Sequence, residues 1–366
     1  MYYPQRFVAL RGILIMSVTR DEVIWAYRMF LGREPESEDV VRLHMKCENL
    51  LSLREEFIRA PEFLLVSKRV SEKSIFVHYN TNFDAVQTML RHAAPNLVAR
   101  EGYLTNFLGV VIDPKFFPTI LEGRSGQVEG IPIPANWHAD IAEWASALRA
   151  VDLARGAFTV IELGCGWGCW MNNTGVAARR AGLDVHMIGI EGDEGHIGFA
   201  HEALRANGFR GSQFTLHRGV AAAAPGIALF PRQNHAGVEW GLEPIFGASK
   251  DQRRRAIASG SHDELPMIPL AKVVEQHPRI DLLHVDIQGG EADLIAGCLP
   301  TLSDRIAYLV IGTHSRQIEG RLFDSLLQKE WRLEMERPAL LSLANGVPIV
   351  TVDGVQGWRN MKLLPD

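Results

Sequence analysis

Residues that could bind a small ligand gather in one stretch of the sequence. It contains a tryptophan and three glycines at alternate positions: Gly164, Gly166, Trp167 and Gly168. Because glycine has no Cβ, such a loop turns sharply and lets a ligand approach main-chain N–H groups. Glu162 precedes the loop, and Glu191 follows it by about twenty residues, where a carboxylate commonly holds the ribose hydroxyls of a nucleoside. The spacing therefore predicts a nucleoside-binding site.

The kind of nucleoside depends on the glycine spacing and on the flanking segments. A dinucleotide fingerprint, G-x-G-x-x-G, would place its third glycine at position 169, which is Cys169. A Walker loop would require a lysine, and this stretch has none. Residues 159–163 and 186–190 are short apolar runs typical of buried parallel strands. They predict that Glu162 and Glu191 lie at two neighbouring strand ends.

The pattern E-x-G-x-G-x-G over residues 162–168 resembles motif I of class I S-adenosylmethionine-dependent methyltransferases. The resemblance implies that Glu162 and the glycine loop hold the methionine part of S-adenosyl-L-methionine, and that Glu191 holds its ribose. It also implies that the end of the third strand lies near the adenine, so Gly219 and Val220 are expected to line the site. An oxidoreductase with a nucleotide cofactor is an alternative, and the position of the third glycine argues against it.

A second informative segment, residues 284–295, reads H-V-D-I-Q-G-G-E-A-D-L-I. It resembles the D-v-E-G-a-E-x-x-x-L signature of FkbM-type methyltransferases, and the resemblance extends over about residues 155–355. Gln288 stands where this family usually has glutamate, and the glycine motif reads Glu-Leu-Gly-Cys-Gly where many members have Asp-x-Gly-Ala-Asn. The resemblance implies O-methylation of a hydroxyl on a sugar or surface glycan. The alternative is a catalytically silent cofactor-binding scaffold that acts through the N-terminal part of the chain.

Three polar residues follow the predicted central strands and are candidates for catalysis. Asp286 comes at a strand end that faces the ligand crevice of open α/β sheets, and it is also expected to contact the cofactor. A sugar hydroxyl is a poor nucleophile, so a general base would assist it. We expect His314 to be that base, with His284 and Asp286 as the next candidates. The same three residues could collect a divalent metal, for which histidines favour zinc or iron over magnesium, but we expect no metal.

The elements that position these residues predict an α/β fold, a Rossmann-like seven-stranded class I methyltransferase sheet. Alternating strands and helices predict parallel β-α-β units, and residues 331–336 and 348–352 are expected to form the final antiparallel pair. Asn136 is expected to cap a helix over residues 137–150. The loops that carry Trp137, His138 and Trp240 are expected to close over the site. The methyltransferase domain is assigned to residues 151–366, after a linker and lid over residues 71–150.

Sequence patterns in the N-terminal part of the chain predict a small helical domain over residues 19–70. Thr19 with Glu22, and Ser52 with Glu55, have the spacing of helix capping boxes, and Gly32 is expected to end the first helix. The segments Y-R-M-F-L-G-R-E-P, L-R-E-E-F-I and P-E-F-L resemble a bacterial domain of unknown function that is similar to phycobilisome-linker modules. The region shows no catalytic constellation, so we expect it to bind a protein partner.

The composition of the chain excludes further classes of protein. The chain has 366 residues, is 47% apolar and carries a net charge of −5, which gives no electrostatic footprint for nucleic acid. Its four cysteines form no CxxC pair, so we expect a reducing, cytoplasmic location. The apolar run at residues 7–18 is too short to span a bilayer, so no transmembrane segment is expected. Residues 1–18 are interpreted as an N-terminal extension, with Met16 as an alternative start.

Overall fold

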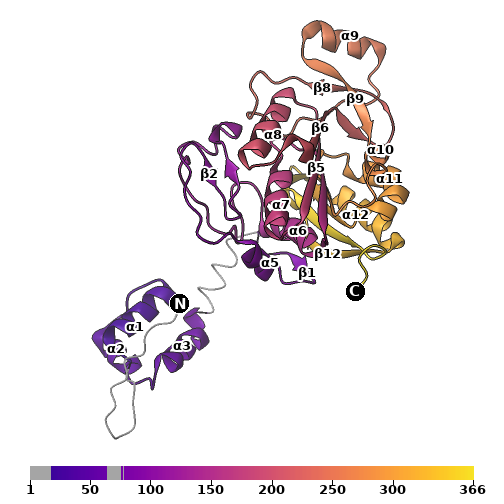
Figure 1. Cartoon of the computed structure of the whole chain (residues 1–366). Helices are drawn as coiled ribbons and strands as arrows, with labels where there is room; N and C mark the ends of the chain where they lie inside the picture. The colour runs from indigo at the N-terminus through magenta and orange to yellow at the C-terminus, as the bar shows by residue number, and fades with distance from the viewer. Residues whose placement is uncertain (1–17, 64–75, 77) are drawn as a thin grey trace. The chain divides into compact units, whose positions relative to one another are not determined.

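The computed structural model describes residues 18–63, 76 and 78–366 (Figure 1). The chain divides into two compact units, residues 1–75 and 76–366. The predicted extension at residues 1–18 lies almost entirely outside the described residues. No described helix is both long and apolar enough to cross a membrane.

The first unit is helical. Its elements are α1 (Arg20–Ala26), a π-helical turn (Tyr27–Leu31), α2 (Glu38–His44) and α3 (Leu50–Arg59). Thr19 and Glu22 form the predicted capping box, and Gly32 ends the first helix in a left-handed conformation. The second predicted capping box is wrong. Asn49 caps α3 instead, because its side chain accepts a hydrogen bond from the backbone N–H of Ser52 at 2.9 Å and starts the helix earlier.

The second unit is built on an eight-stranded sheet in the order β1-β12-β15-β11-β10-β4-β5-β6. These strands are β1 (Asn80–Thr81), β12 (Trp331–Arg337), β15 (Gly354–Asn360), β11 (Tyr308–Thr313), β10 (Leu282–Val285), β4 (Ala157–Leu163), β5 (Asp184–Glu191) and β6 (Phe214–Arg218). The five strands from β11 to β6 are parallel, while β12 and β15 run antiparallel to their neighbours. The predicted α/β class is confirmed, and β1 adds a strand that the sequence did not predict.

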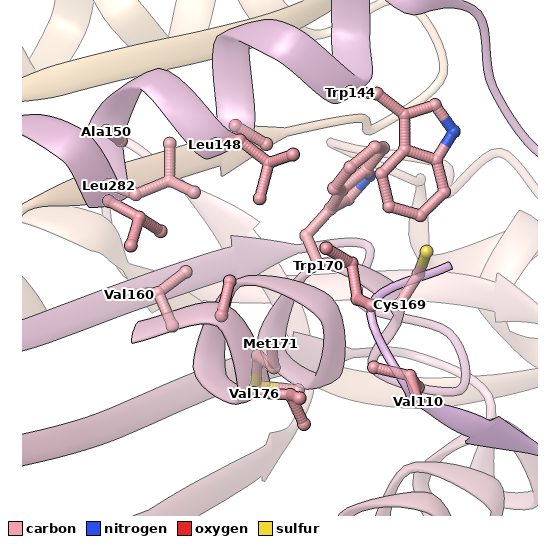
Figure 2. Packing of buried hydrophobic residues seen from close by; sticks show 14 of the residues in the cluster. Val110, Trp144, Leu148, Ala150, Val160, Cys169, Trp170, Met171, Val176 and Leu282 are labelled. Carbon is pink, nitrogen blue, oxygen red and sulfur yellow. The ribbon is translucent and has the colours of Figure 1, made fainter. Parts of the chain in front are cut away.

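Helices cover both faces of this sheet (Figure 1). One face packs on α5 (Ala85–His92), α6 (Ile141–Leu153), α7 (Cys169–Arg180) and α8 (Glu194–Ala206). The other packs on α10 (Leu270–Val274), α11 (Glu291–Arg305) and α12 (Arg316–Leu326). Because strand side chains alternate, Val160 of β4 belongs to the first core and Ile161 to the second. Figure 2 shows the first core, where Trp144 of α6 lies beside Trp170 of α7.

The other strands form separate, smaller sheets. They are β2 (Leu104–Thr105) with β3 (Val111–Ile112), β7 (Val220–Ala222) with β9 (His262–Pro269) and β8 (Gly226–Pro231), and the hairpin β13 (Leu340–Ala344) with β14 (Val347–Val352). A further helix, α9 (Lys250–Ser259), lies between β8 and β9 in the chain. The prediction that residues 348–352 pair with 331–336 is wrong. Residues 348–352 belong to the mostly exposed β14, whereas fully buried β15 is the antiparallel partner of β12.

The start of α6 also differs from the prediction. Asp140, not Asn136, caps this helix, because its side chain accepts a hydrogen bond from the N–H of Glu143 at 3.1 Å. Asn136 instead accepts hydrogen bonds from the N–H groups of His138 and Ala139, each at 3.0 Å. Residues 136–139 therefore form a turn before the helix.

We expect Arg337→Ala to destabilise the second unit by about 3–5 kcal/mol, because it leaves a buried carboxylate without its partner. Arg337 and Asp140 are 5% and 4% exposed and form an ion pair that joins β12 to the start of α6. Urea unfolding followed by near-UV circular dichroism measures the change. Arg332→Ala is the control, because Arg332 lies on the same strand and pairs with exposed Asp366, so that its loss should change the free energy of unfolding much less. Equal losses in both variants would contradict the prediction.

Candidate active site

A cavity of about 1200 Å³ opens at the carboxyl ends of β4, β5, β10 and β11. Open parallel sheets bind their ligands in this position. Eight residues predicted to contact the cofactor line it: Glu162, Gly164, Gly166, Trp167, Glu191, Gly219, Val220 and Asp286. The catalytic candidates His284 and His314 line it as well. Gly168 does not, because it caps the start of α7 in a left-handed conformation and packs against Met171 and Asn172.

Two glycines in the loop are required by close packing. Gly164 has φ +68°, and a Cβ there would lie 2.1 Å from the carbonyl oxygen of Asp286. Gly166 has φ +51°, and its N–H donates to Glu191 at 2.8 Å. A side chain at either position would strain the backbone and push the loop away from its neighbours. The loop therefore holds the ends of β4, β5 and β10 close together.

Glu162 and Glu191 line the same cavity, and backbone amides orient both carboxylates. Glu162 accepts hydrogen bonds from the N–H groups of Trp170 at 3.1 Å and Met171 at 2.9 Å, at the start of α7. Glu191 accepts from Gly166 and from Asp193, each at 2.8 Å. Burial raises the pKa of Glu191, and it raises the pKa of Glu162 to about 7. Glu162 thus changes charge near neutral pH.

The stability of the protein should therefore fall, through Glu162, as the pH rises from about 4.5 to about 7. Below its ordinary pKa of 4.5 the carboxyl holds its proton both folded and unfolded, so the folded state keeps its full advantage. Above that pH the unfolded chain loses the proton first, and the advantage is gone once the pH passes 7, a change of about 3 kcal/mol. Urea unfolding at pH 5 and pH 8 measures it. The stability of the wild type relative to that of Glu162→Gln should fall from pH 5 to pH 8; a constant difference would contradict the assignment.

In the structure, the three catalytic candidates lie in two separate groups of polar side chains: His284 with Glu143, and His314 with Asp286. His284 is 2% exposed, and its Nε2 lies 2.9 Å from Oε1 of Glu143. Burial opposes the charged form of His284, but Glu143, together with Glu162 and Asp286, raises the pKa of the imidazole. The ring also stacks on Trp170 at 5.1 Å. His284 is thus held by α6 and α7, and its partner Glu143 was not predicted.

His314 lies between two carboxylates. Its Nε2 is 3.3 Å from Oδ1 of Asp286, and its Nδ1 is 2.9 Å from Oε1 of Glu291. Burial would lower the pKa of His314, but these two acids raise it to about 10. Both ring nitrogens are occupied, so His314 has no free lone pair for an acceptor hydroxyl. The geometry therefore argues against the predicted role of His314 as the base.

Asp286 is the catalytic candidate that is most open to the cavity. Its side chain is 43% exposed, against 16% for His314 and 2% for His284. Burial opposes ionisation, but His314 outweighs it and keeps the pKa of Asp286 below its ordinary value. Asp286 is thus an ionised carboxylate at neutral pH. Gln288, the departure from the family pattern, donates to Oδ1 of Asp286 at 3.1 Å and fixes the carboxylate.

Aromatic rings form the outer wall of the cavity. Trp240 stacks between Phe117 at 4.2 Å and His196 at 4.0 Å, and its indole lies 2.7 Å from where a Cβ of Gly166 would be. Trp137 and His138 also line the cavity, and burial lowers the pKa of His138 to about 4, so this ring is neutral. All three loop residues predicted to close over the site therefore face it. The sequence did not indicate the two partners of Trp240, because no local motif links them.

The lining of the cavity is rich in carboxylates. Six carboxylate residues line it: Glu143, Glu162, Glu191, Glu243, Asp286 and Asp293. Among the residues that the structure describes, the lining includes no lysine or arginine. A pocket of this kind favours a neutral or cationic ligand and disfavours the phosphates of a dinucleotide or a nucleic acid.

The chain is similar to several known methyltransferases. The family model described as "Methyltransferase FkbM domain" matches residues 180–337. A curated protein of Jannaschia sp. (strain CCS1), named "Putative methyltransferase", is 46% identical over 272 residues, which are 74% of this chain and 97% of that protein. The crystal structure of methyltransferase FkbM from Methylobacillus flagellatus KT is 12% identical, with a TM-score of 0.37 over 60% of this chain and 54% of that one. Ribosomal protein L11 methylase from Lactobacillus delbrueckii subsp. bulgaricus is also 12% identical, with a TM-score of 0.32 over 73% and 99%.

Proposed function

This chain belongs to the FkbM-type methyltransferases, and from this premise we propose that it transfers the methyl group of S-adenosyl-L-methionine to a hydroxyl oxygen of a sugar or surface glycan. The observation that carries the proposal is the acidic cavity over the glycine loop, at the ends of the central parallel strands. S-adenosyl-L-methionine supplies a methyl group activated by a positively charged sulfur, so the difficult chemistry belongs to the cofactor.

The residues around the cavity fit this cofactor. Glu162 and the loop at Gly164 and Gly166 would hold its methionine part. Each oxygen of Glu191 accepts one backbone hydrogen bond, and a carboxylate oxygen has a further lone pair for a ribose hydroxyl. Gly219, which follows β6, and Val220, the first residue of β7, would face the adenine. The carboxylates favour a cationic sulfonium, while the absence of lysine and arginine from the described lining argues against a dinucleotide and its two phosphates.

The chain would contribute mainly position and a proton acceptor. Holding two reactants in line supplies about 7–11 kcal/mol, whereas a general base adds about 10²–10⁴-fold. Asp286 is the proposed base, since its carboxylate is ionised and open to the cavity. Asp286 would accept the proton of the acceptor hydroxyl, and bound S-adenosyl-L-methionine would supply the methyl group, with the C–S electron pair kept on its sulfur. The loops at Trp137 and Trp240 exclude water from this step.

The lining supports a neutral sugar as the acceptor. Aromatic rings with a few converging polar groups are typical of pockets for small organic ligands. Trp137, Trp240 and Phe246 offer apolar surfaces for the C–H faces of a sugar ring, and Glu143 and Asp286 offer acceptors for its hydroxyls. A nucleic acid would need basic side chains that the described lining does not have.

We also propose a protein partner for the first unit and a cytoplasmic location. Trp25 and Met29, on α1 and the π-helical turn, are 58% and 74% exposed, which leaves apolar surface available for docking. All four cysteines are free, as a reducing compartment favours.

Calorimetry of the full chain with S-adenosyl-L-methionine, S-adenosylhomocysteine and NAD tests the cofactor. We expect the first two to bind and NAD not to bind; the reverse result would support the oxidoreductase alternative. Transfer of a labelled methyl group to cell-envelope glycan extracts then tests the reaction. Cofactor binding without any transfer would favour the silent scaffold.

A further inference from the structure

A group of three polar residues overlaps the proposed methyl-transfer site through Asp286, and it includes Glu291, to which the sequence analysis gave no role. Asp286 follows β10, Glu291 begins α11 and His314 follows β11, so three separate elements bring these side chains together. One potential ligand atom from each residue can be chosen so that all three lie within 4.8 Å of one another. His284, which we had grouped with Asp286 and His314, is not part of this set, since Glu143 holds it.

The hydrogen bonds of the Glu291 carboxylate give a second, independent reason to expect a ligand at this group. It is 0% exposed, and its Oε1 accepts three hydrogen bonds, from the N–H groups of Ile287 at 3.2 Å and Gly289 at 3.0 Å and from His314 at 2.9 Å. Its other oxygen, Oε2, is buried and has no partner among the described residues. Burying a carboxylate oxygen without a hydrogen-bond partner costs free energy. This oxygen therefore indicates that a ligand binds here and contacts it.

We propose that Asp286, Glu291 and His314 bind a divalent metal ion. The ion would replace the proton that Nε2 of His314 shares with Oδ1 of Asp286, and that proton would be released to solvent. The distance of 3.3 Å between these two atoms fits two ligands of one ion, because bonds of about 2.1 Å at 90–109° separate neighbouring ligand atoms by about 3.0–3.4 Å. The surrounding cavity carries carboxylates and no described lysine or arginine that would repel a cation.

The donor set indicates the class of metal. Two carboxylates and one imidazole suit Mn²⁺, Fe²⁺ or Zn²⁺ better than Mg²⁺ or Ca²⁺, which prefer all-oxygen sites. Hydrogen bonds from neighbouring groups already orient the two carboxylates, as they orient the ligands of known metal sites. Gln288 orients Asp286 with a hydrogen bond of 3.1 Å, and the amides of Ile287 and Gly289 orient Glu291.

Three protein ligands leave open coordination positions on the ion. If the proposed function holds, on which this step rests, those positions can take the acceptor oxygen. A metal-bound hydroxyl loses its proton more readily, which would compensate for the weak basicity of Asp286. The binding site itself does not depend on this role.

Metal binding is tested on the full chain, stripped with a chelator and titrated with MnCl₂ and separately with ZnCl₂, without cofactor or acceptor. We expect one ion per chain by calorimetry, with Mn²⁺ binding confirmed by electron paramagnetic resonance. His314→Gln and Asp286→Asn should each weaken binding by at least about 10-fold. Two variants are used so that a folding defect in one, seen by near-UV circular dichroism, does not decide the result.

His217→Gln is the matched control, because it makes the same change on β6, outside the cavity lining. Its affinity for metal should equal that of the wild type. The proposal fails if the wild type binds no ion, or if both site variants bind as tightly as the control; the three residues would then form only an ion-paired triad. Metal binding without methyl transfer would remove the proposed function and leave the metal site standing.

Discussion

Gly166→Val should reduce the affinity for S-adenosyl-L-methionine by at least about 100-fold, the largest binding loss that we expect from one substitution. The backbone at Gly166 has φ +51°, which a β-branched residue adopts only with strain. A valine side chain would also occupy the surface that the loop offers to the cofactor. Calorimetry with S-adenosyl-L-methionine measures the loss.

Two controls separate the causes of that loss. Gly182→Val makes the same change at φ +80° with no atom within 4 Å of the added Cβ, so it tests strain alone and should leave affinity unchanged. Gly166→Val combined with Trp240→Ala removes the indole that the new side chain would meet at 2.7 Å. We expect the double variant to bind as weakly as Gly166→Val. Full recovery would mean that the collision with Trp240 causes the loss, and that the cofactor does not contact Gly166.

Asp286→Asn should lower kcat by about 10²–10⁴-fold, the range for loss of a general base, and leave cofactor affinity within about threefold of the wild type. Asparagine keeps the shape of the side chain but cannot accept the proton at neutral pH. Methyl transfer at saturating cofactor gives kcat, and calorimetry gives the affinity. Asp324→Asn, on an exposed face of α12, is the control and should keep full activity. Unchanged turnover of Asp286→Asn would remove Asp286 from the chemistry.

Much of the fold could be predicted because its signals are local. The capping box at Thr19 and the left-handed turn at Gly32 depend on residues within one helical turn. The strand ends at Glu162 and Glu191 follow from short apolar runs and the glycine spacing between them. Such patterns fix backbone conformation from neighbours in the chain, and a cavity lies at these strand ends.

The chemical state of the site was decided by tertiary contacts. Glu143 and His284 are 141 residues apart in the chain, and no periodicity links them. His314 was a reasonable base by its position, but its two carboxylate neighbours come from another strand end and another helix, and they raise its pKa to about 10. The orphaned oxygen of Glu291 depends on burial by several elements at once.

The sequence by itself determined the class of fold and the strand ends that line the cavity. Only the tertiary structure decided that β15 and not β14 completes the sheet, and that Asp286 and not His314 is open to the cavity. The reason is physical. Propensity and spacing act over a few residues, while burial, ion pairing and pKa shifts depend on side chains that folding brings together from distant positions.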